Sequence, residues 1–376
     1  MKCLFGGTTL KKNAKSFIPF AAIATILLIS YILQKVPKTY GSDDSLNVYQ
    51  KFQAGQPIQY LVVGDSIGRG SGAENPNLTW FKQLENKMND VNDIPLHGDY
   101  VVQSGSTAFE GLFKLSQRKK HDHKDLIFIV FGENDRKYMK VDDFIMTYEA
   151  LIRKVKRLHP NAELFTITES SLKYEEFASA IELLSKHYSA TNVDMRPIFQ
   201  TSGYTEKQLT KDLIHPNGLG YQFYANAIYE QFLDNTKQEK PIANLPSKLH
   251  AGSKLDLSEV DNYEKMIGFR PRGDYFTSNE KGSLIEYNFK GSILGVKLLR
   301  SPDGGEVAVF IDGNEITSLN TWWPFARERY LFITNGLSPG SHTVRFEVTG
   351  RTMASDLTTL PYVRISSIIT DDINHY

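Results

Sequence analysis

The sequence is poor in the features that mark several classes of protein. Its 376 residues contain a single cysteine, Cys3, so no disulfide can form within the chain. The 43 Lys and Arg residues are balanced by 43 Asp and Glu residues, without the basic excess of nucleic-acid-binding proteins. No repeat of fixed period is visible. The length allows two or three domains of ordinary globular composition, for which we expect no nucleic-acid partner.

A long uncharged run lies near the N-terminus, from Phe17 to Leu33. Four lysines precede it and two follow it closely, a bias that favours a cytoplasmic N-terminus. We therefore predict a basic cytoplasmic tail (1–15), a transmembrane anchor (16–34) and a polar tether (35–57), with the rest of the chain outside the cell membrane. The alternative is secretion after cleavage of a signal peptide, although the apolar core of such peptides is typically about 7–15 residues long.

Between residues 58 and 236, short apolar runs alternate with segments of helical periodicity. Apolar runs that do not alternate with polar residues are typical of buried parallel strands. Strands that alternate with helices predict an α/β domain with a doubly wound, mostly parallel, flavodoxin-like sheet. The predicted strands are 60–63, 100–102, 125–131, 162–168 and 192–195, and the clearest predicted helices are 144–158, 174–187 and 220–233.

Polar residues follow three of these strands, and two more precede the last helix. Ser66, Gly105 and Asn134 come after the first three strands, and Asp212 and His215 lie in the loop before residue 220. Since parallel strands end at one edge of a sheet, we expect these groups to converge. A serine hydroxyl needs a base to become a nucleophile. His215 is the candidate base, and Asp212 can hold its imidazole in the required tautomer and orientation.

Each of these residues also has a purely structural interpretation. Asn134 could cap the helix that follows it, Asp212 could belong to a turn, and the His215–Pro216 pair could be structural. Asp135 is expected to brace the site without reacting. A metal site at the sequence His-Asp-His (121–123) is disfavoured because no third ligand is nearby, and we predict neither a metal nor a cofactor.

Three short motifs together resemble those of the SGNH, or GDSL-type, hydrolase family. They are Gly64-Asp65-Ser66, Gly132-Glu133-Asn134-Asp135 and Asp212-Leu213-Ile214-His215, in the family's order and with similar spacing. The resemblance implies a catalytic triad of Ser66, Asp212 and His215. It also implies an oxyanion hole formed by the N–H groups of Ser66 and Gly105 and the side-chain amide of Asn134. The block around Gly105 departs from the family's asparagine-led form.

A polar linker (237–252) precedes a region of different periodicity (253–376). Short strands separated by turn signals such as Asp312-Gly313 predict an antiparallel β-sandwich. The strings VAVFIDGNEI and LSPGSHTVRFEV resemble the jelly-roll modules attached to carbohydrate-active enzymes. Trp322 and Trp323 are possible carbohydrate contacts. The alternative is that they pack inside the sandwich or against the α/β domain.

These observations predict a membrane-tethered serine esterase that removes O-acyl groups, acetyl above all, from cell-envelope carbohydrate through an acyl-serine intermediate. The expected partners are an acylated carbohydrate, or another ester, and the membrane that holds the N-terminal helix. The same site could serve an O-acetyltransferase acting on cell-wall polysaccharide, or a lipid esterase. A surface protein that binds carbohydrate without catalysis is the alternative outside the enzyme class.

Overall fold

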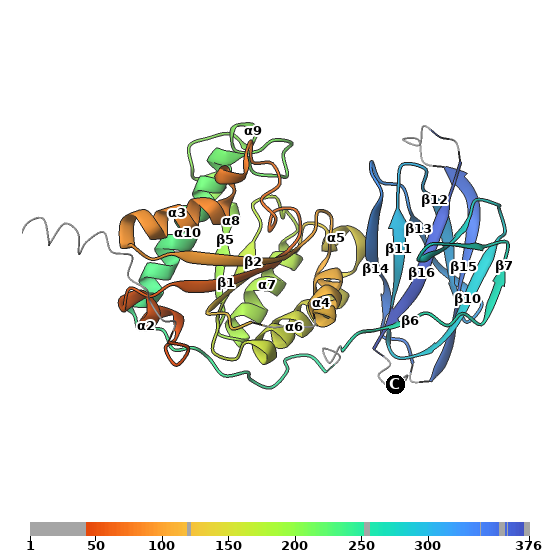
Figure 1. Cartoon of the computed structure of the whole chain (residues 1–376), viewed down its shortest axis with the longest axis horizontal. Coiled ribbons are helices and arrows are strands. Elements are labelled where there is room, and N and C mark those ends of the chain that lie inside the picture. The colour runs from red at the N-terminus through yellow and green to blue at the C-terminus, as the bar shows by residue number, and fades with distance from the viewer. Residues whose placement is uncertain are drawn as a thin grey trace, which may run out of the picture. The chain divides into compact units, whose positions relative to one another are not determined.

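The computed structural model describes residues 43–118, 122–251, 256–338, 340–352, 358 and 360–371. The predicted cytoplasmic tail and transmembrane anchor lie outside these residues. Within the described part of the chain, no helix is both long and apolar enough to cross a membrane. Residues Asp43–Tyr376 form one compact unit, which contains an α/β domain and a β-sandwich (Figure 1).

The α/β domain is built on a five-stranded parallel sheet with the order β2-β1-β3-β4-β5. The prediction of a parallel doubly wound sheet is confirmed. Strand β1 pairs with β2 on one side and with β3 on the other, so the chain changes direction across the sheet at β1. Ligands in open α/β sheets bind at such switch points. The strands are β1 (Ile58–Gly64), β2 (Leu96–Val102), β3 (Leu126–Val130), β4 (Glu163–Thr168) and β5 (Thr191–Asp194).

Helices cover both faces of this sheet because its strands are apolar on both faces. In β1, Leu61 and Val63 pack under α4, α6 and α7, whereas Tyr60 and Val62 pack under α2, α3 and α10. The helices are α2 (Val48–Gln53), α3 (Trp80–Asn92), α4 (Ala108–Gln117), α5 (Asp135–Tyr138), α6 (Val141–Leu158), α7 (Glu175–His187), α8 (Met195–Gln200), α9 (Glu206–Leu209) and α10 (Gly218–Lys237), with a 3₁₀ turn at Pro76–Leu78.

The predicted tether (35–57) needs a correction in its second half. Val48–Gln53 form α2, and Val48 and Tyr49 are buried in the core of the α/β domain. Asn47 accepts hydrogen bonds from the first turn, and Gln50 bonds back to the backbone of Asn47. This capping box was a readable signal for a helix start.

The C-terminal domain is a sandwich of two antiparallel sheets, as predicted. Their strand orders are β13-β12-β15-β10-β7 and β14-β11-β16-β9-β8, and β6 pairs with β16. Asp312 and Gly313 both have positive φ and form the tight turn between β12 and β13. The strands are β6 (Ser258–Val260), β7 (Lys265–Ile267), β8 (Arg270–Arg272), β9 (Tyr275–Ser278), β10 (Leu284–Lys290), β11 (Ile293–Arg300), β12 (Gly305–Ile311), β13 (Asn314–Asn320), β14 (Arg327–Asn335), β15 (Ser341–Thr352) and β16 (Val363–Thr370).

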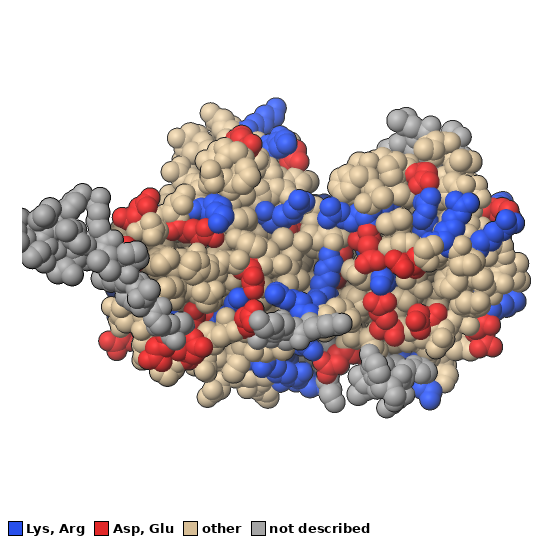
Figure 2. Space-filling model, in the orientation of Figure 1, with Lys and Arg blue, Asp and Glu red and all other residues tan. Residues whose placement is uncertain are grey.

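The two domains share a buried interface between α4 and β14. Phe109 of α4 stacks edge-on against Phe332 of β14 with ring centroids 5.7 Å apart, and Phe113 lies 4.8 Å from Tyr330. Phe332 belongs to the same apolar core cluster as the residues of α4. On the face shown in Figure 2, acidic and basic side chains are interspersed.

Candidate active site

Ser66 lies in the turn that follows β1, and its residue is only 5% exposed. The turn is fixed on both sides of the serine. The N–H of Asp65 donates to the carbonyl of Val130 in the neighbouring strand β3, at 3.1 Å, and the N–H of Ser71 donates to the carbonyl of Ser66, at 2.8 Å. The hydroxyl is therefore held at the carboxyl edge of the sheet, at the switch point.

The loop before α10 brings His215 and Asp212 to this hydroxyl. Nε2 of His215 lies 2.9 Å from Oγ of Ser66, and Nδ1 of His215 lies 2.7 Å from Oδ2 of Asp212. Oδ1 of Asp212 accepts the N–H groups of His215 and Ile214. Partial burial alone would raise the pKa of Asp212, but these hydrogen bonds lower it overall, so the carboxylate stays ionised beside the imidazole.

Gly72 lets the histidine loop approach the serine loop. Its φ is +104°, and an added Cβ would lie 2.4 Å from the carbonyl oxygen of Pro216 and 2.8 Å from Cβ of His215. Only glycine combines that backbone conformation with such a close approach. Gly72 therefore sets the position of His215 without touching the reacting atoms.

Asn134 follows β3 and occupies the N-cap position of α5, yet its side chain makes no capping hydrogen bond. Its Nδ2 instead donates to Oδ2 of Asp65, at 2.6 Å. The amide is thereby tied to the residue next to Ser66, and the capping interpretation does not describe the structure. One amide hydrogen remains for another acceptor.

Gly105 follows β2 with φ of +79°. Its loop is tied to the serine loop, because the N–H of Gln103 donates to the carbonyl of Gly64, at 3.1 Å, and Oγ of Ser104 lies 3.3 Å from Oγ of Ser71. The carbonyl of Gly105 accepts a 2.6 Å hydrogen bond from Arg329 of the sandwich. The structure thus brings the loops of all five predicted catalytic and oxyanion residues together at one edge.

Three buried carboxyl groups lie beneath this edge. Burial raises the pKa of Asp65 to about 6 and that of Asp135 to about 7. Burial, followed by the charge of Asp65, raises the pKa of Glu169 well above its usual value. Oε2 of Glu169 accepts the N–H of Glu133, at 2.8 Å, whereas Oε1 is buried with no other partner among the described residues. The interaction between the two side chains raises the pKa of Glu169 and lowers that of Asp65, so these two carboxyl groups influence each other's ionisation.

Asp135 braces the site, as expected, and does not face the reacting groups. Its Oδ1 accepts the N–H of Ala108 at the start of α4, at 2.8 Å, and its Oδ2 accepts the N–H of Gly132, at 3.1 Å. It therefore joins the loops that follow β2 and β3, the same loops that carry Gly105 and Asn134.

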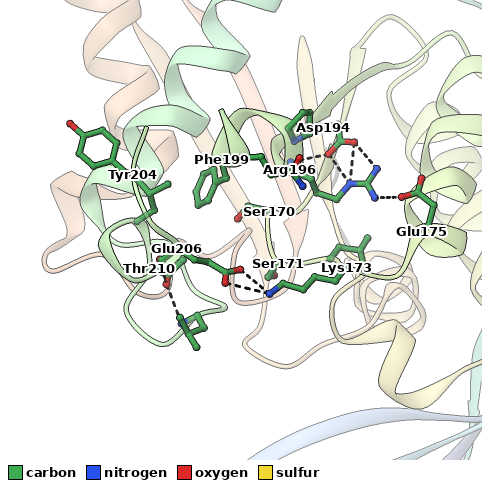
Figure 3. Close-up of a pocket in the computed structure, with 15 residues that line it drawn as sticks. Ser170, Ser171, Lys173, Glu175, Asp194, Arg196, Phe199, Tyr204, Glu206 and Thr210 are labelled. Carbon is green, nitrogen blue, oxygen red and sulfur yellow. Dashed lines mark hydrogen bonds and ion pairs between the residues drawn. The ribbon is translucent and has the colours of Figure 1, made fainter. Parts of the chain in front are cut away.

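A pocket of about 690 Å³, which we name the α9 pocket, lies beside the loop that carries Asp212 and His215 (Figure 3). Thr210 and Leu213 of that loop line it, together with residues that follow β4 and β5. Its charged side chains are paired with one another, which suits a polar ligand better than a long acyl chain. The ion pairs are Lys173 with Glu206, and Arg196 with Asp194 and Glu175.

A second hollow of about 500 Å³, the edge cavity, lies between α5 and the edge strands β13 and β14 of the sandwich. Trp322 and Trp323 both line it, because they follow β13 in a loop and not within a strand. Cη2 of Trp323 would lie 3.3 Å from a Cβ on Gly105. The two tryptophans are half-buried, and the cavity borders the loop of the predicted oxyanion hole.

No group of three or more His, Cys, Asp or Glu side chains among the described residues is placed to hold a metal ion. His121 lies outside these residues. Nε2 of His123 lies 2.8 Å from Oδ1 of Asp125, so this histidine pairs with the residue that precedes β3.

The fold and this geometry are typical of hydrolases that cleave esters. Residues 62–223 match the model of the GDSL-like Lipase/Acylhydrolase family, and the α/β domain is a domain of that family. The chain is accordingly a carboxylic ester hydrolase. Comparison with curated protein sequences gives no match.

Two solved structures share the two-domain architecture. One is a two-domain esterase (CEX) active on acetylated mannans, co-crystallised with mannopentaose. Its TM-score is 0.68 and its sequence identity is 19%, and the match covers 86% of this chain and 93% of that chain. The second is also a two-domain esterase (CEX) active on acetylated mannans, with a TM-score of 0.67 and 20% identity over the same shares of both chains. This likeness establishes the combined fold of both domains.

Sequence reasoning missed several groups at the site. Glu169 had a readable signal, since it directly follows an apolar strand at the same sheet edge as Ser66 and Asn134. Gly72 and the sandwich residues Arg300 and Arg329 had none, because their importance depends on which distant loop or domain packs against them.

Proposed function

We propose that this chain removes O-acyl groups, acetyl above all, from carbohydrate through an acyl-serine intermediate, with Ser66, His215 and Asp212 as the catalytic triad. The observation that carries the proposal is the continuous chain of hydrogen bonds from Asp212 through His215 to Ser66, with distances of 2.7 and 2.9 Å. This is the arrangement that activates a serine hydroxyl for attack on an ester.

In this mechanism Oγ of Ser66 attacks the acyl carbon while Nε2 of His215 takes the hydroxyl proton. The tetrahedral oxyanion is stabilised by the N–H groups of Ser66 and Gly105 and by the free hydrogen of the Asn134 amide. His215 then gives the proton to the departing sugar oxygen. Water, activated by the same histidine, hydrolyses the acyl-serine.

The two hollows beside the site support a polar substrate. The α9 pocket has paired charges next to the loop that carries His215, and the edge cavity has two tryptophan rings, of which Trp323 lies next to Gly105. Aromatic rings with neighbouring polar groups suit the apolar and hydroxyl faces of a sugar. The structurally similar two-domain esterase is described as active on acetylated mannans, which favours carbohydrate over lipid as the alcohol part of the ester.

We also propose that the enzyme is tethered to the outer face of a cell membrane by residues 16–34. The support is the uncharged run with its preceding lysines. Protease added to intact cells from which the wall has been stripped should remove both folded domains. Full protection of the domains would contradict this location, and release of a shortened chain into the medium would indicate a cleaved signal peptide.

Exposure of the full chain to an activated acetyl ester, followed by intact-mass analysis, tests the chemistry. We expect one acetyl group on Ser66 and none on the Ser66→Ala variant, whose turnover should fall by up to about 10⁶-fold. Near-native turnover in Ser66→Ala would refute the assignment. Competition between water and candidate sugar acceptors then separates an esterase from an O-acetyltransferase.

A further inference from the structure

Arg300, at the end of β11, is a buried cation without a counter-ion. The residue is 5% exposed, and its Nε is buried with no hydrogen-bond partner among the described residues. No carboxylate in the described part of the chain lies within ion-pair distance of its guanidinium. Removing such a charge from water is costly unless an anion compensates for it. The side chain lines the edge cavity, where a ligand could supply that anion.

Other donors around the cavity also lack acceptors. Nε1 of Trp322, Nε1 of Trp323 and Nη1 of Arg329 are all buried and unpartnered among the residues that the structure describes. Cζ of Arg300 lies 5.9 Å from the Trp323 ring and Cζ of Arg329 lies 5.7 Å from it, so two guanidinium groups flank one indole. Buried donors are ordinarily satisfied in proteins, so this cluster of unpartnered donors distinguishes the region around Trp323.

The charges that face Arg300 leave the cavity positive. Arg329 is paired with Glu110, at 2.9 Å, and Lys137 is paired with Glu133, at 3.3 Å. Both carboxylates pair with cations other than Arg300. Glu110 also pairs with Lys114, at 3.5 Å. Glu133 is likewise shared with Arg136, at 2.5 Å, so the cations of this region outnumber its two carboxylates, and Arg300 is the one cation among those named here without a carboxylate partner in the described part of the chain.

The pKa of Tyr138 reflects this positive charge. Its ring centroid lies 5.7 Å from Cζ of Arg300. Burial alone would raise the pKa of the Tyr138 phenol, but the charges of Arg300, Arg329 and Lys137 lower it overall. Burial lowers the pKa of Arg300 itself. A lowered tyrosine pKa and a lowered arginine pKa are both expected in a pocket that is positive and partly desolvated. Such a pocket would stabilise a bound anion.

We propose that the edge cavity binds an anionic oxygen group of the carbohydrate substrate, a carboxylate or a phosphate, with Arg300 as its counter-ion. A guanidinium matches the geometry of either group through paired N–H donors. The tryptophan rings supply a surface for the sugar that carries the anion.

Because the cavity borders Gly105, an acidic sugar held there would place a neighbouring acylated sugar near Ser66. A neutral glycan would leave Arg300 uncompensated. The identity of the ligand as a carbohydrate rests on the proposed function, whereas the anion site does not.

Thermal unfolding of the full chain carrying Ser66→Ala tests the site without turnover. The probes are oligogalacturonate, a glycerol-phosphate oligomer and mannopentaose. We expect one of the two anionic probes to raise the melting temperature. Mannopentaose, which is neutral, should raise it less. The anionic probe with the larger shift shows whether the site binds a carboxylate or a phosphate. Arg300→Met should abolish the shift. Arg272→Met, on the exposed strand β8 at the opposite edge of the same sheet, should retain it.

Without ligand, Arg300→Met should melt at a higher temperature than its parent, because an uncompensated buried charge has been removed. If this variant fails to fold, Arg300→Gln takes its place. An equal shift from mannopentaose, or a shift that survives in the Arg300 variant, would overturn the proposal.

Activity provides the second arm. Arg300→Met should lower kcat/KM on an acetylated anionic glycan, such as acetylated polygalacturonate, by about 10- to 100-fold. It should lower kcat/KM on acetylated mannan and on 4-nitrophenyl acetate by clearly less, because these esters carry no anionic group for Arg300 to bind. Equal losses on the charged and neutral polymers would contradict the anion site. If the parent turned over no ester at all, the proposed function would fail while the thermal experiment still decided the inference.

Discussion

The side-chain amide of Asn134 donates a 2.6 Å hydrogen bond to the carboxylate of Asp65, the residue immediately before Ser66. Oδ1 of the same carboxylate accepts the N–H of Ile67, at 2.8 Å, immediately after the serine. Asp65 therefore fixes the backbone that follows Ser66 and, through Oδ2, the orientation of the Asn134 amide. An oxyanion donor has to be positioned in advance of the reaction to be effective, and this carboxylate positions it.

Replacing Asn134 by alanine should therefore impair chemistry and not folding. Loss of one oxyanion donor is expected to lower kcat by roughly 10²–10³-fold, with little change in KM. Because the side chain makes no capping hydrogen bond, the melting temperature should change little. Steady-state kinetics and thermal unfolding on the same preparation measure both quantities. A kcat that falls only as far as the folded fraction falls would contradict the oxyanion role.

Gly72→Ala should displace His215. The added Cβ would lie 2.4 Å from the carbonyl of Pro216, so the histidine loop has to move, and a misplacement of about 1 Å can cost about 10²-fold in rate. Gly203→Ala is a matched control, since Gly203 also has a positive φ, of +81°, but its added Cβ would meet nothing within 4 Å. Equal losses of kcat in the two variants would show that backbone strain alone, and not His215, is responsible.

The ion pair between Arg329 and Glu110 should couple the stabilities of the two domains. The side chains are 1% and 0% exposed, and breaking a buried pair by removing one partner typically costs about 3–5 kcal/mol. Arg329→Met and Glu110→Gln should each lower the free energy of unfolding by that order. The double variant should lose clearly less than the sum, because neither partner is left buried alone.

Urea unfolding measures this cycle. Arg351→Met, which removes a largely exposed ion pair with Glu306 in the same sandwich, should cost less than about 1 kcal/mol. Additive effects of the Arg329 and Glu110 substitutions would show that the pair does not couple the domains.

Much of the fold could be predicted from sequence because its signals are local. The unbroken apolar run at residues 126–130 indicates a strand buried on both faces, and Asp312-Gly313 indicates a tight hairpin. The groups at Ser66, Asn134, Asp212 and His215 could be proposed because parallel strands end at one sheet edge, whatever their separation in the chain.

The edge cavity could not be predicted in the same way. Arg300 follows an apolar strand and looks like an ordinary surface residue until α5 covers it, and Arg329 gains its partner Glu110 only when β14 packs against α4. The roles of both residues depend on how the two domains pack against each other. No periodicity in the sequence indicates that packing. The same holds for the buried pair of Asp65 and Glu169, which come from strands that are not neighbours in the sheet.

Glu169 provides a prediction for the dependence of stability on pH. Its folded pKa lies well above the usual value of 4.5, so the folded chain keeps a proton that the unfolded chain has lost. The free energy of unfolding should therefore fall as pH rises from about 4.5 through the folded pKa, by at most about 1.4 kcal/mol per pH unit from this group. Glu169→Gln removes the titration but keeps a side-chain oxygen that can accept the N–H of Glu133. Its stability relative to the parent should rise as the pH increases above about 4.5, with kcat retained. Glu176→Gln, an exposed change in α7, should follow the parent. A constant difference between Glu169→Gln and the parent would show that Glu169 is ionised in the folded chain.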